Sequence, residues 1–165
     1  MRCGSEAPAP WDRSLQDSAL TPFNVEVERG RLRTFARATG QEHPLFLDEA
    51  AARAAGHPGL LVPPTFLFCL AMEGPNPQEI FERLGVNCAH VLHGEQHFDY
   101  HRPACAGQTL HFAPRIGRLY AKKGGALRFF EWQNRVTDGD GRALADLRSV
   151  MVVRTPSKED GYAAA

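Results

Sequence analysis

The chain has 165 residues, a length that suits one domain with a substantial hydrophobic core. Lys plus Arg and Asp plus Glu are equal at 19 each, so no basic field favours nucleic acid. No apolar run is long enough to span a membrane, and residues 1–14 lack the apolar stretch of a signal peptide. We therefore expect a cytoplasmic protein that binds neither nucleic acid nor membrane.

The first half of the chain predicts an arm, a strand and helices. Residues 1–21 mix Ala, Pro, Ser and charge, with only Trp11 and Leu15 to anchor them, and are predicted to be a flexible arm. Apolar residues alternate over 23–27, which indicates a strand. Residues 29–40 show helical spacing and end in a glycine.

Two more helices follow. Residues 47–56 predict a short helix that Asp48 caps. Residues 63–72 are apolar on every side, so a helix there is expected to be buried all round, with Pro64 at its first position.

The segment 76–85 predicts another helix. Asn76 is the expected cap, Pro77 takes the first position, Glu79 completes a capping box and Gly85 ends the helix.

From residue 89 the hydrophobic period changes to two, which predicts long strands. The expected strands lie around residues 97–101, 109–116, 127–136 and 145–154, with turns at 122–125 and 138–141. An antiparallel sheet wrapped around the apolar helix satisfies this order, so the fold class is α+β. The domain is expected to cover residues 22–155, with a flexible tail over 156–165.

Metal ligands show no useful spacing. The cysteines, Cys3, Cys69, Cys88 and Cys105, form no C-x-x-C pair. On a straight strand His93, Glu95, His97 and His101 would share one face, but residues four apart on a strand are about 13 Å apart. We predict no metal site, and a solvated or dimer-facing strand surface instead.

Three segments carry a family resemblance: FARATGQEHPLFLDEAAARAAG (35–56), GLLVPPTF (59–66) and HGEQHFDYHRPACAGQTL (93–110). They resemble MaoC-like dehydratases, and the likeness extends over residues 23–154. The resemblance implies a hotdog fold, a paired assembly of hotdogs, and acyl-CoA or acyl-carrier-protein thioesters as ligands, with no cofactor beyond the thioester itself.

The catalytic pattern of that family is D-x-N-P-x-H, whose Asp and His add water to, or remove it from, the double bond of a 2-enoyl thioester. In hydration one group takes a proton from water and the other handles the proton at the α-carbon. In this chain the Asp position is Gln41, the Asn position is His43 and the His position is Phe46, while Pro44 is retained. An amide and a phenyl ring offer no proton transfer near neutral pH.

A third departure concerns the oxyanion. The family's glycine at the head of the central helix falls on Pro64, which has no N–H to donate, whereas a one-residue shift would leave the N–H of Thr65 available. We therefore expect an acyl-thioester-binding subunit of a hydratase or dehydratase, similar to the family's N-terminal, non-catalytic halves. Such a subunit would need a partner chain that carries the Asp/His dyad.

Two alternatives stay open. The first is a homodimeric thioesterase or a hydratase with shifted catalytic residues. Its candidate catalytic residues are Gln41 and the adjacent acid–imidazole pair Glu42 and His43. The other alternative is a non-enzymatic acyl-CoA binding module.

Candidate ligand contacts surround the same motifs. Phe46, Pro64, Thr65 and Phe66 are the expected substrate-binding residues, and Phe68, Leu70 and Met72 are expected to line an acyl tunnel or simply the core. The basic residues Arg102, Arg115, Arg118, Lys122 and Lys123 are candidates for contact with coenzyme A phosphates or an acidic carrier. A single hotdog leaves a sheet edge exposed, so a homodimer or a heterodimer with a catalytic hotdog chain is expected.

Overall fold

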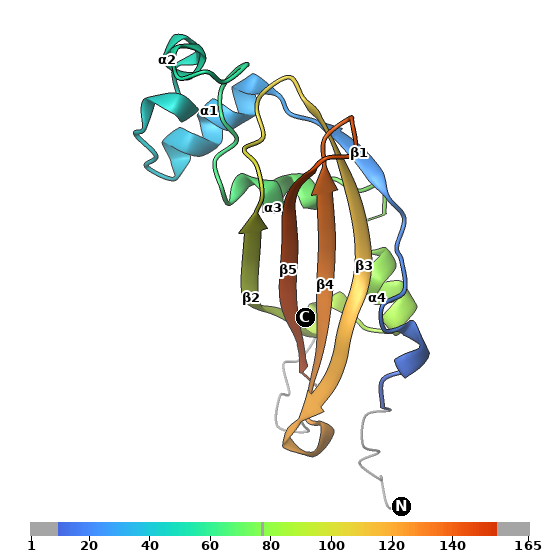
Figure 1. Cartoon of the computed structure of the whole chain (residues 1–165). Helices are drawn as coiled ribbons and strands as arrows, with labels where there is room; N and C mark the ends of the chain where they lie inside the picture. The colour runs from blue at the N-terminus through green and yellow to red at the C-terminus, as the bar shows by residue number, and fades with distance from the viewer. Residues whose placement is uncertain (1–9, 77, 155–165) are drawn as a thin grey trace, which may run out of the picture.

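A computed structural model describes residues 10–76 and 78–154 of the chain (Figure 1). Its centre is one five-stranded antiparallel sheet in the order β1-β3-β4-β5-β2. The strands are β1 Phe23–Glu26, β2 Val91–Tyr100, β3 Thr109–Lys122, β4 Leu127–Thr137 and β5 Ala143–Arg154. The predicted α+β class and antiparallel meander are confirmed.

The helices are short and occupy two places. They are α1 Arg29–Ala38, α2 Glu49–Ala54, α3 Phe66–Ala71 and α4 Glu79–Leu84, with 3-10 turns η1 Arg13–Leu15, η2 Pro44–Phe46, η3 Cys88–His90 and η4 Lys123–Gly125. Figure 1 shows α3 and α4 behind the sheet, while α1 and α2 gather at the end of the sheet away from the β3–β4 hairpin. The sheet therefore has a helix face and an outer face.

Alternation along the strands sends most of their buried apolar residues to the helix face. One core cluster joins Phe112 and Val136 of the sheet to Phe66 and Leu70 of α3. A second cluster packs Phe130 and other sheet residues against α4. Burial of this apolar surface is the main stabilising contribution to the fold.

Local end signals behave as the sequence predicts for two helices. Asp48 Oδ1 accepts a hydrogen bond from the N–H of Ala50 at 2.8 Å and so caps α2. Gly40, just beyond α1, and Gly56, just beyond α2, have φ of 67° and 89°, the left-handed conformation that a glycine adopts without strain.

The central helix differs from the prediction. It begins at Phe66, and Pro64 lies in the turn before it rather than at its first position. Phe68 and Cys69 are only half-buried and Met72 is 43% exposed, so the helix is not covered on all sides. The reason is that one sheet covers one face of a helix, and the opposite face has no cover within the described residues.

The start of α4 also differs. Gln78 stands at the cap position and the helix begins at Glu79. Glu79 Oε2 accepts a hydrogen bond from the N–H of Thr21 instead of completing a capping box. Asn76 accepts from the N–H of Gln78, Pro77 lies outside the described residues, and the predicted end at Gly85 is confirmed by its φ of 59°.

The described part of the predicted arm, residues 10–21, follows the sheet. Trp11 Nε1 donates to the backbone oxygen of Tyr120 at 3.0 Å, Leu20 is buried, and Ala19 forms a β-bridge with Arg115. Residues 1–9 and the predicted tail 156–165 lie outside the described residues.

A bulge in β2 overturns the predicted single face of histidines. Opposite β5, His93 pairs with Met151 and Glu95 with Val150, so Gly94 is the extra residue. A Cβ at Gly94 would lie 3.1 Å from the backbone oxygen of Val150, which explains why glycine occupies this position. His93 therefore faces α3, with its ring 5.2 Å from that of Phe68, whereas Glu95 and His97 lie on the outer face.

Within residues 10–76 and 78–154, no helix is long and apolar enough to cross a membrane.

Candidate acyl-thioester pocket

An apolar pocket opens where η2, the segment before α3 and the end of β2 converge. Its volume is about 240 Å³. Its lining residues come from four parts of the chain and are Phe46, Leu61, Val62, Pro64, Leu67, Tyr100, Arg102, Pro103 and Ala104. Two of the predicted substrate-binding residues, Phe46 and Pro64, thus lie in one pocket.

The loop that carries the degenerate motif is closed by its own side chains. Gln41 Oε1 accepts from the N–H of His43 at 3.1 Å, and His43 Nδ1 accepts from the N–H of Leu45 at 3.3 Å. His43 thereby caps η2, and its Nδ1 is occupied by this hydrogen bond. Glu42 is exposed, and none of Gln41, Glu42 and His43 lines the pocket.

The cap at His43 sets the direction of the next residues. The N–H of Phe46 donates to the backbone oxygen of His43 at 3.1 Å, and the N–H of Leu61 donates to the backbone oxygen of Leu45 at 3.0 Å. These bonds hold η2 against the segment that leads into α3. Phe46, at the position that the resemblance assigns to the family's histidine, therefore places an apolar ring in the pocket wall.

Tyr100 supplies the polar hydroxyl of the pocket. Its hydroxyl donates to the backbone oxygen of Pro64 at 2.5 Å and ties the end of β2 to the turn before α3. Burial raises the pKa of Tyr100 to about 12, because the apolar surroundings disfavour the phenolate. Tyr100 is therefore a neutral hydrogen-bonding group near neutral pH.

Sequence reasoning missed Tyr100. Tyr100 appears in the sequence only as one of several alternating strand aromatics, and its hydrogen bond joins residues 36 positions apart. Arg102, a predicted contact for coenzyme A phosphates or an acidic carrier, is one of the residues that line the pocket.

The two remaining predicted contacts do not join Phe46. Thr65 stands at the cap position of α3 and is exposed. Phe66 is buried in the core, 4.9 Å from the ring of Phe35, with the Arg31 guanidinium 5.5 Å from its centroid. Phe66 borders a different surface hollow, along α1.

An exposed strand edge runs from the pocket at Tyr100 to Leu92 at the other end of β2. β2 pairs with β5 only, so its other edge carries no strand within the described residues. Leu92 is 59% exposed, Tyr100 47% and Met72 43%, and these are the three large hydrophobic residues exposed in the described chain. An unpaired edge next to exposed apolar side chains is the usual surface for association.

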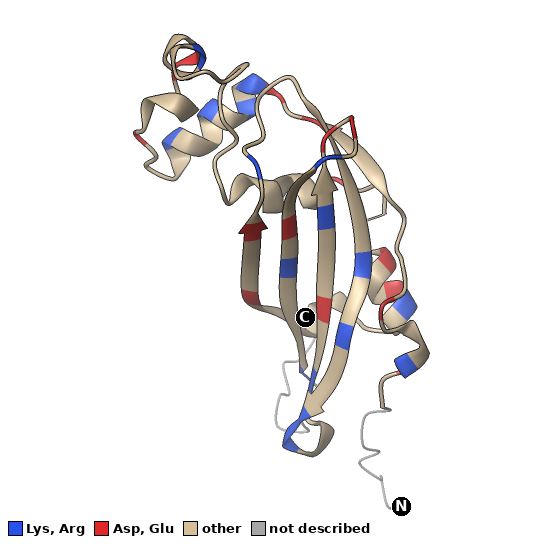
Figure 2. Ribbon diagram, in the orientation of Figure 1, with Lys and Arg blue, Asp and Glu red and all other residues tan. Residues whose placement is uncertain are grey.

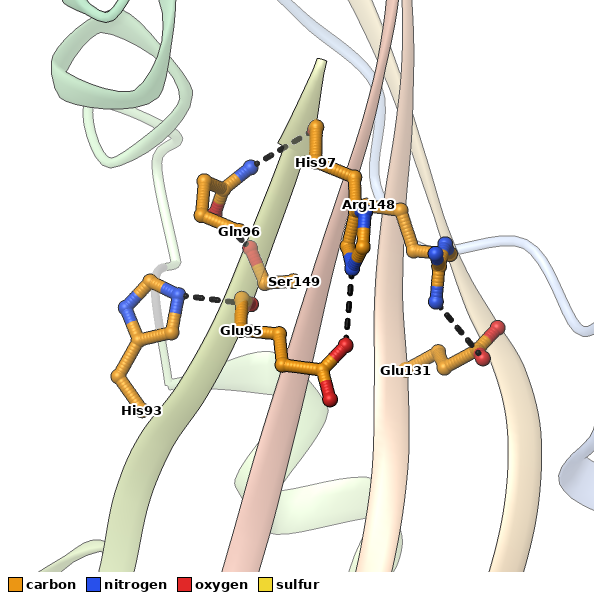
Figure 3. A network of polar contacts seen from close by, with 7 residues as sticks. All are labelled: His93, Glu95, Gln96, His97, Glu131, Arg148 and Ser149. Atoms are coloured by element: carbon orange, nitrogen blue, oxygen red, sulfur yellow. Dashed lines mark hydrogen bonds and ion pairs between the residues drawn. The ribbon is translucent and has the colours of Figure 1, made fainter.

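The outer face carries a polar network (Figure 3). His97 Nε2 lies 2.9 Å from Glu95 Oε2, and Arg148 lies 3.4 Å from the buried carboxylate of Glu131. The hydrogen bond from His97 lowers the pKa of Glu95. The described residues contain no group of three His, Cys, Asp or Glu placed to hold a metal.

The sheet, the helix it carries and the pocket at the end of β2 define a MaoC-like hotdog dehydratase domain. A family model described as "FAS1-like, dehydratase domain region" matches residues 5–147, and the chain belongs to this family.

Curated relatives match along nearly the whole chain. A UPF0336 protein of Saccharopolyspora erythraea is 32% identical over 151 residues, which are 91% of this chain and 96% of the relative. A UPF0336 protein of Mycolicibacterium paratuberculosis is 34% identical over 146 residues, covering 87% of this chain and 81% of the relative.

Solved structures agree. The HadBC (3R-hydroxyacyl-ACP dehydratase) complex of Mycobacterium tuberculosis contains a chain with a TM-score of 0.74 and 26% identity, covering 84% of this chain and 96% of that chain. A MaoC-like dehydratase matches with a TM-score of 0.75 and 29% identity, covering 87% of this chain and 43% of that longer chain. A chain of the ChsH1-ChsH2 complex of Mycobacterium tuberculosis, with a TM-score of 0.67 and 22% identity, covers 85% of this chain and 90% of that one and shares the fold.

Proposed function

We propose that this chain is the non-catalytic subunit of a 3-hydroxyacyl/2-enoyl thioester dehydratase. It shapes an acyl-binding pocket and acts with a hotdog partner that carries the Asp/His dyad. The observation that carries this proposal is Phe46, whose apolar ring lines the pocket. The sequence resemblance assigns the family's proton-transferring histidine to this position.

The other groups near the pocket support the same role. Gln41 and His43 are engaged in closing the loop, and the Tyr100 hydroxyl is engaged with the backbone oxygen of Pro64. General acid–base groups and an oxyanion donor each contribute roughly 10²–10⁴-fold to a rate. A pocket without them retains binding and loses most of the rate.

The exposed edge supports a partner. Pairing β2 with the equivalent strand of another hotdog would satisfy its free backbone groups and cover Met72 and the half-buried Phe68 on the helix face. The HadBC and ChsH1-ChsH2 structures are complexes of two named chains, which is the assembly proposed here.

The test compares the purified chain with and without a hotdog chain that has an intact D-x-N-P-x-H motif. Loss of the enoyl absorbance of crotonyl-CoA measures hydration. We expect background turnover from this chain alone, and a pair that turns over faster than the partner alone. Robust turnover by the isolated chain would overturn the proposal.

A second assay addresses the open alternatives. Thiol release from acyl-CoAs of several lengths detects thioesterase activity, and Glu42→Ala and His43→Ala test the candidate residues. Tight acyl-CoA binding with no effect on any partner's turnover would instead favour a binding module. The matched pocket variant is Phe46→Ala, which is expected to change the chain-length preference of the pair without abolishing its activity.

A further inference from the structure

One row of apolar side chains crosses the outer face at the hairpin end of the sheet. Tyr120 is opposite Phe129, Phe129 is opposite Val152, and Val152 is opposite Leu92. The rings of Tyr120 and Phe129 stack with centroids 4.8 Å apart and an interplanar angle of 2°. Tyr120, Phe129 and Val152 are half-buried and Leu92 is 59% exposed, so the row is a partly exposed apolar surface.

Cations flank this row. The Lys122 ammonium lies 5.1 Å from the ring centroid of Phe129 and 5.7 Å from that of Tyr120, and the Arg118 guanidinium lies 5.6 Å from Tyr120. Both cationic side chains are exposed. Figure 2 shows further Lys and Arg at the closed end of the β3–β4 hairpin, where Lys123 follows β3.

The neighbouring acid is already engaged. Glu95, an outer-face carboxylate of β2, pairs with His97, and the charge of Lys122 also helps to lower its pKa. We call Leu92, Val152, Phe129, Tyr120, Arg118 and Lys122 the aromatic–basic patch. Exposed cations around an apolar row are complementary to an acidic protein surface that carries a few apolar side chains.

The position of the patch matters for the proposed heterodimer. The pocket lies at the Tyr100 end of β2, whereas the patch lies at its Leu92 end, about 26 Å away at roughly 3.3 Å per residue. Two hotdogs that pair these edge strands around a two-fold axis bring them together antiparallel. The patch of this chain then lies on the outer face, near the end of the partner's edge strand that corresponds to Tyr100. The acyl group passes around that end of the sheet to reach the pocket on the helix face.

We propose that the aromatic–basic patch is a docking surface for an acidic carrier protein that delivers the acyl thioester to the partner's pocket. The inference rests on the proposed function. It gives this subunit a second task, because the chain without the dyad holds the carrier while the chain with the dyad acts on the acyl group.

The experiment uses Lys122→Glu and the double variant Arg118→Glu/Lys122→Glu, each assembled with the catalytic partner. Arg37→Glu, an exposed reversal on α1, is the control with the same charge change as the single variant. We expect the double variant to raise the KM for an acyl-carrier-protein substrate about tenfold, which corresponds to ~1.4 kcal/mol over two charge pairs. The KM for the matching acyl-CoA and the kcat for both are expected to stay within about twofold, and the carrier effect to shrink at high salt.

A binding measurement separates this inference from the proposed function. Fluorescence anisotropy of labelled holo-carrier protein with this chain alone should show salt-dependent binding that the double variant loses and Arg37→Glu keeps. Leu92→Ser, which removes apolar surface without changing charge, should weaken the same binding.

Each outcome has one meaning. An inactive wild-type pair would overturn the proposed function, while carrier binding would still test the patch. An unchanged carrier KM in the double variant would overturn the docking surface and leave the proposed function standing. An equal rise in the KM for acyl-CoA would indicate that the patch binds coenzyme A phosphates and would overturn its assignment to a carrier protein.

Discussion

Gly117 of β3 lies under the side chains of β4, in the irregular stretch between Ile116 and Leu119. A Cβ added there would be 2.5 Å from Gln133 Nε2, 2.8 Å from Gln133 Cδ and 3.0 Å from Glu131 Cβ. Gln133 can move because its amide ends a flexible side chain, but Glu131 Cβ is fixed to the strand. Gly117→Ala therefore forces Gln133 out and strains the β3–β4 contact.

The cost follows from those contacts. Displacing Gln133 breaks its 2.9 Å hydrogen bond to the carboxylate of the buried Glu131. A hydrogen bond to a charged group contributes about 1.5–3 kcal/mol, and overpacking costs about 1–3 kcal/mol. Because Gln133 is half-exposed and water replaces part of the bond, we expect Gly117→Ala to lower the free energy of unfolding by about 2 kcal/mol.

Urea unfolding at fixed protein concentration measures this loss. The control is Gly139→Ala, since a Cβ at Gly139 meets nothing within 4 Å and the change should stay within about 0.5 kcal/mol. The double variant Gly117→Ala/Gln133→Ala removes the clashing amide, so it should be more stable than the sum of the single losses predicts by at least ~0.5 kcal/mol. Strict additivity, or a Gly117→Ala midpoint equal to wild type, would refute the packing argument.

Three further predictions concern single groups. Asp48→Ala removes the cap of α2 and should cost about 1 kcal/mol in urea unfolding. Spectrophotometric titration should show one tyrosine with a pKa of about 12, above the ordinary tyrosine value, and Tyr100→Phe should abolish that late step. Because burial favours the neutral phenol, the contribution of Tyr100 to folding stability is present below the ordinary tyrosine pKa. That contribution is lost as pH rises through about 12. Because the pKa of Glu95 is lowered in the folded protein, Glu95 contributes to folding stability above the ordinary glutamate pKa. That contribution is lost as pH falls through the lowered pKa. NMR titration should return the Glu95 pKa toward its ordinary value in His97→Ala, and no change would exclude His97 as the cause.

Two errors of sequence reasoning share one cause: each judged an element without the neighbouring element that decides its outcome. The histidines of β2 were counted by parity on a straight strand, and Gly94 shifted that count by one residue. The central helix was judged by its own composition, yet its exposure depends on what a single sheet can cover, and Phe68 and Met72 lie on the uncovered side.

The sequence by itself determined the local structure of this protein. The change of hydrophobic period, the cap at Asp48 and the glycine at the end of α4 act within a few residues, so they are visible in the chain alone. The ordered motifs also identified the hotdog family, and the resemblance predicts a departure from its catalytic pattern at Gln41 and Phe46.

Only the tertiary structure decided which distant residues meet. Phe46, Pro64 and Tyr100 come from three segments and share one pocket. Tyr120 and Leu92 become members of one patch because β3, β4, β5 and β2 adopt one register. Strand register depends on packing over the whole sheet, including its bulges, so it cannot be predicted from any single segment of the chain.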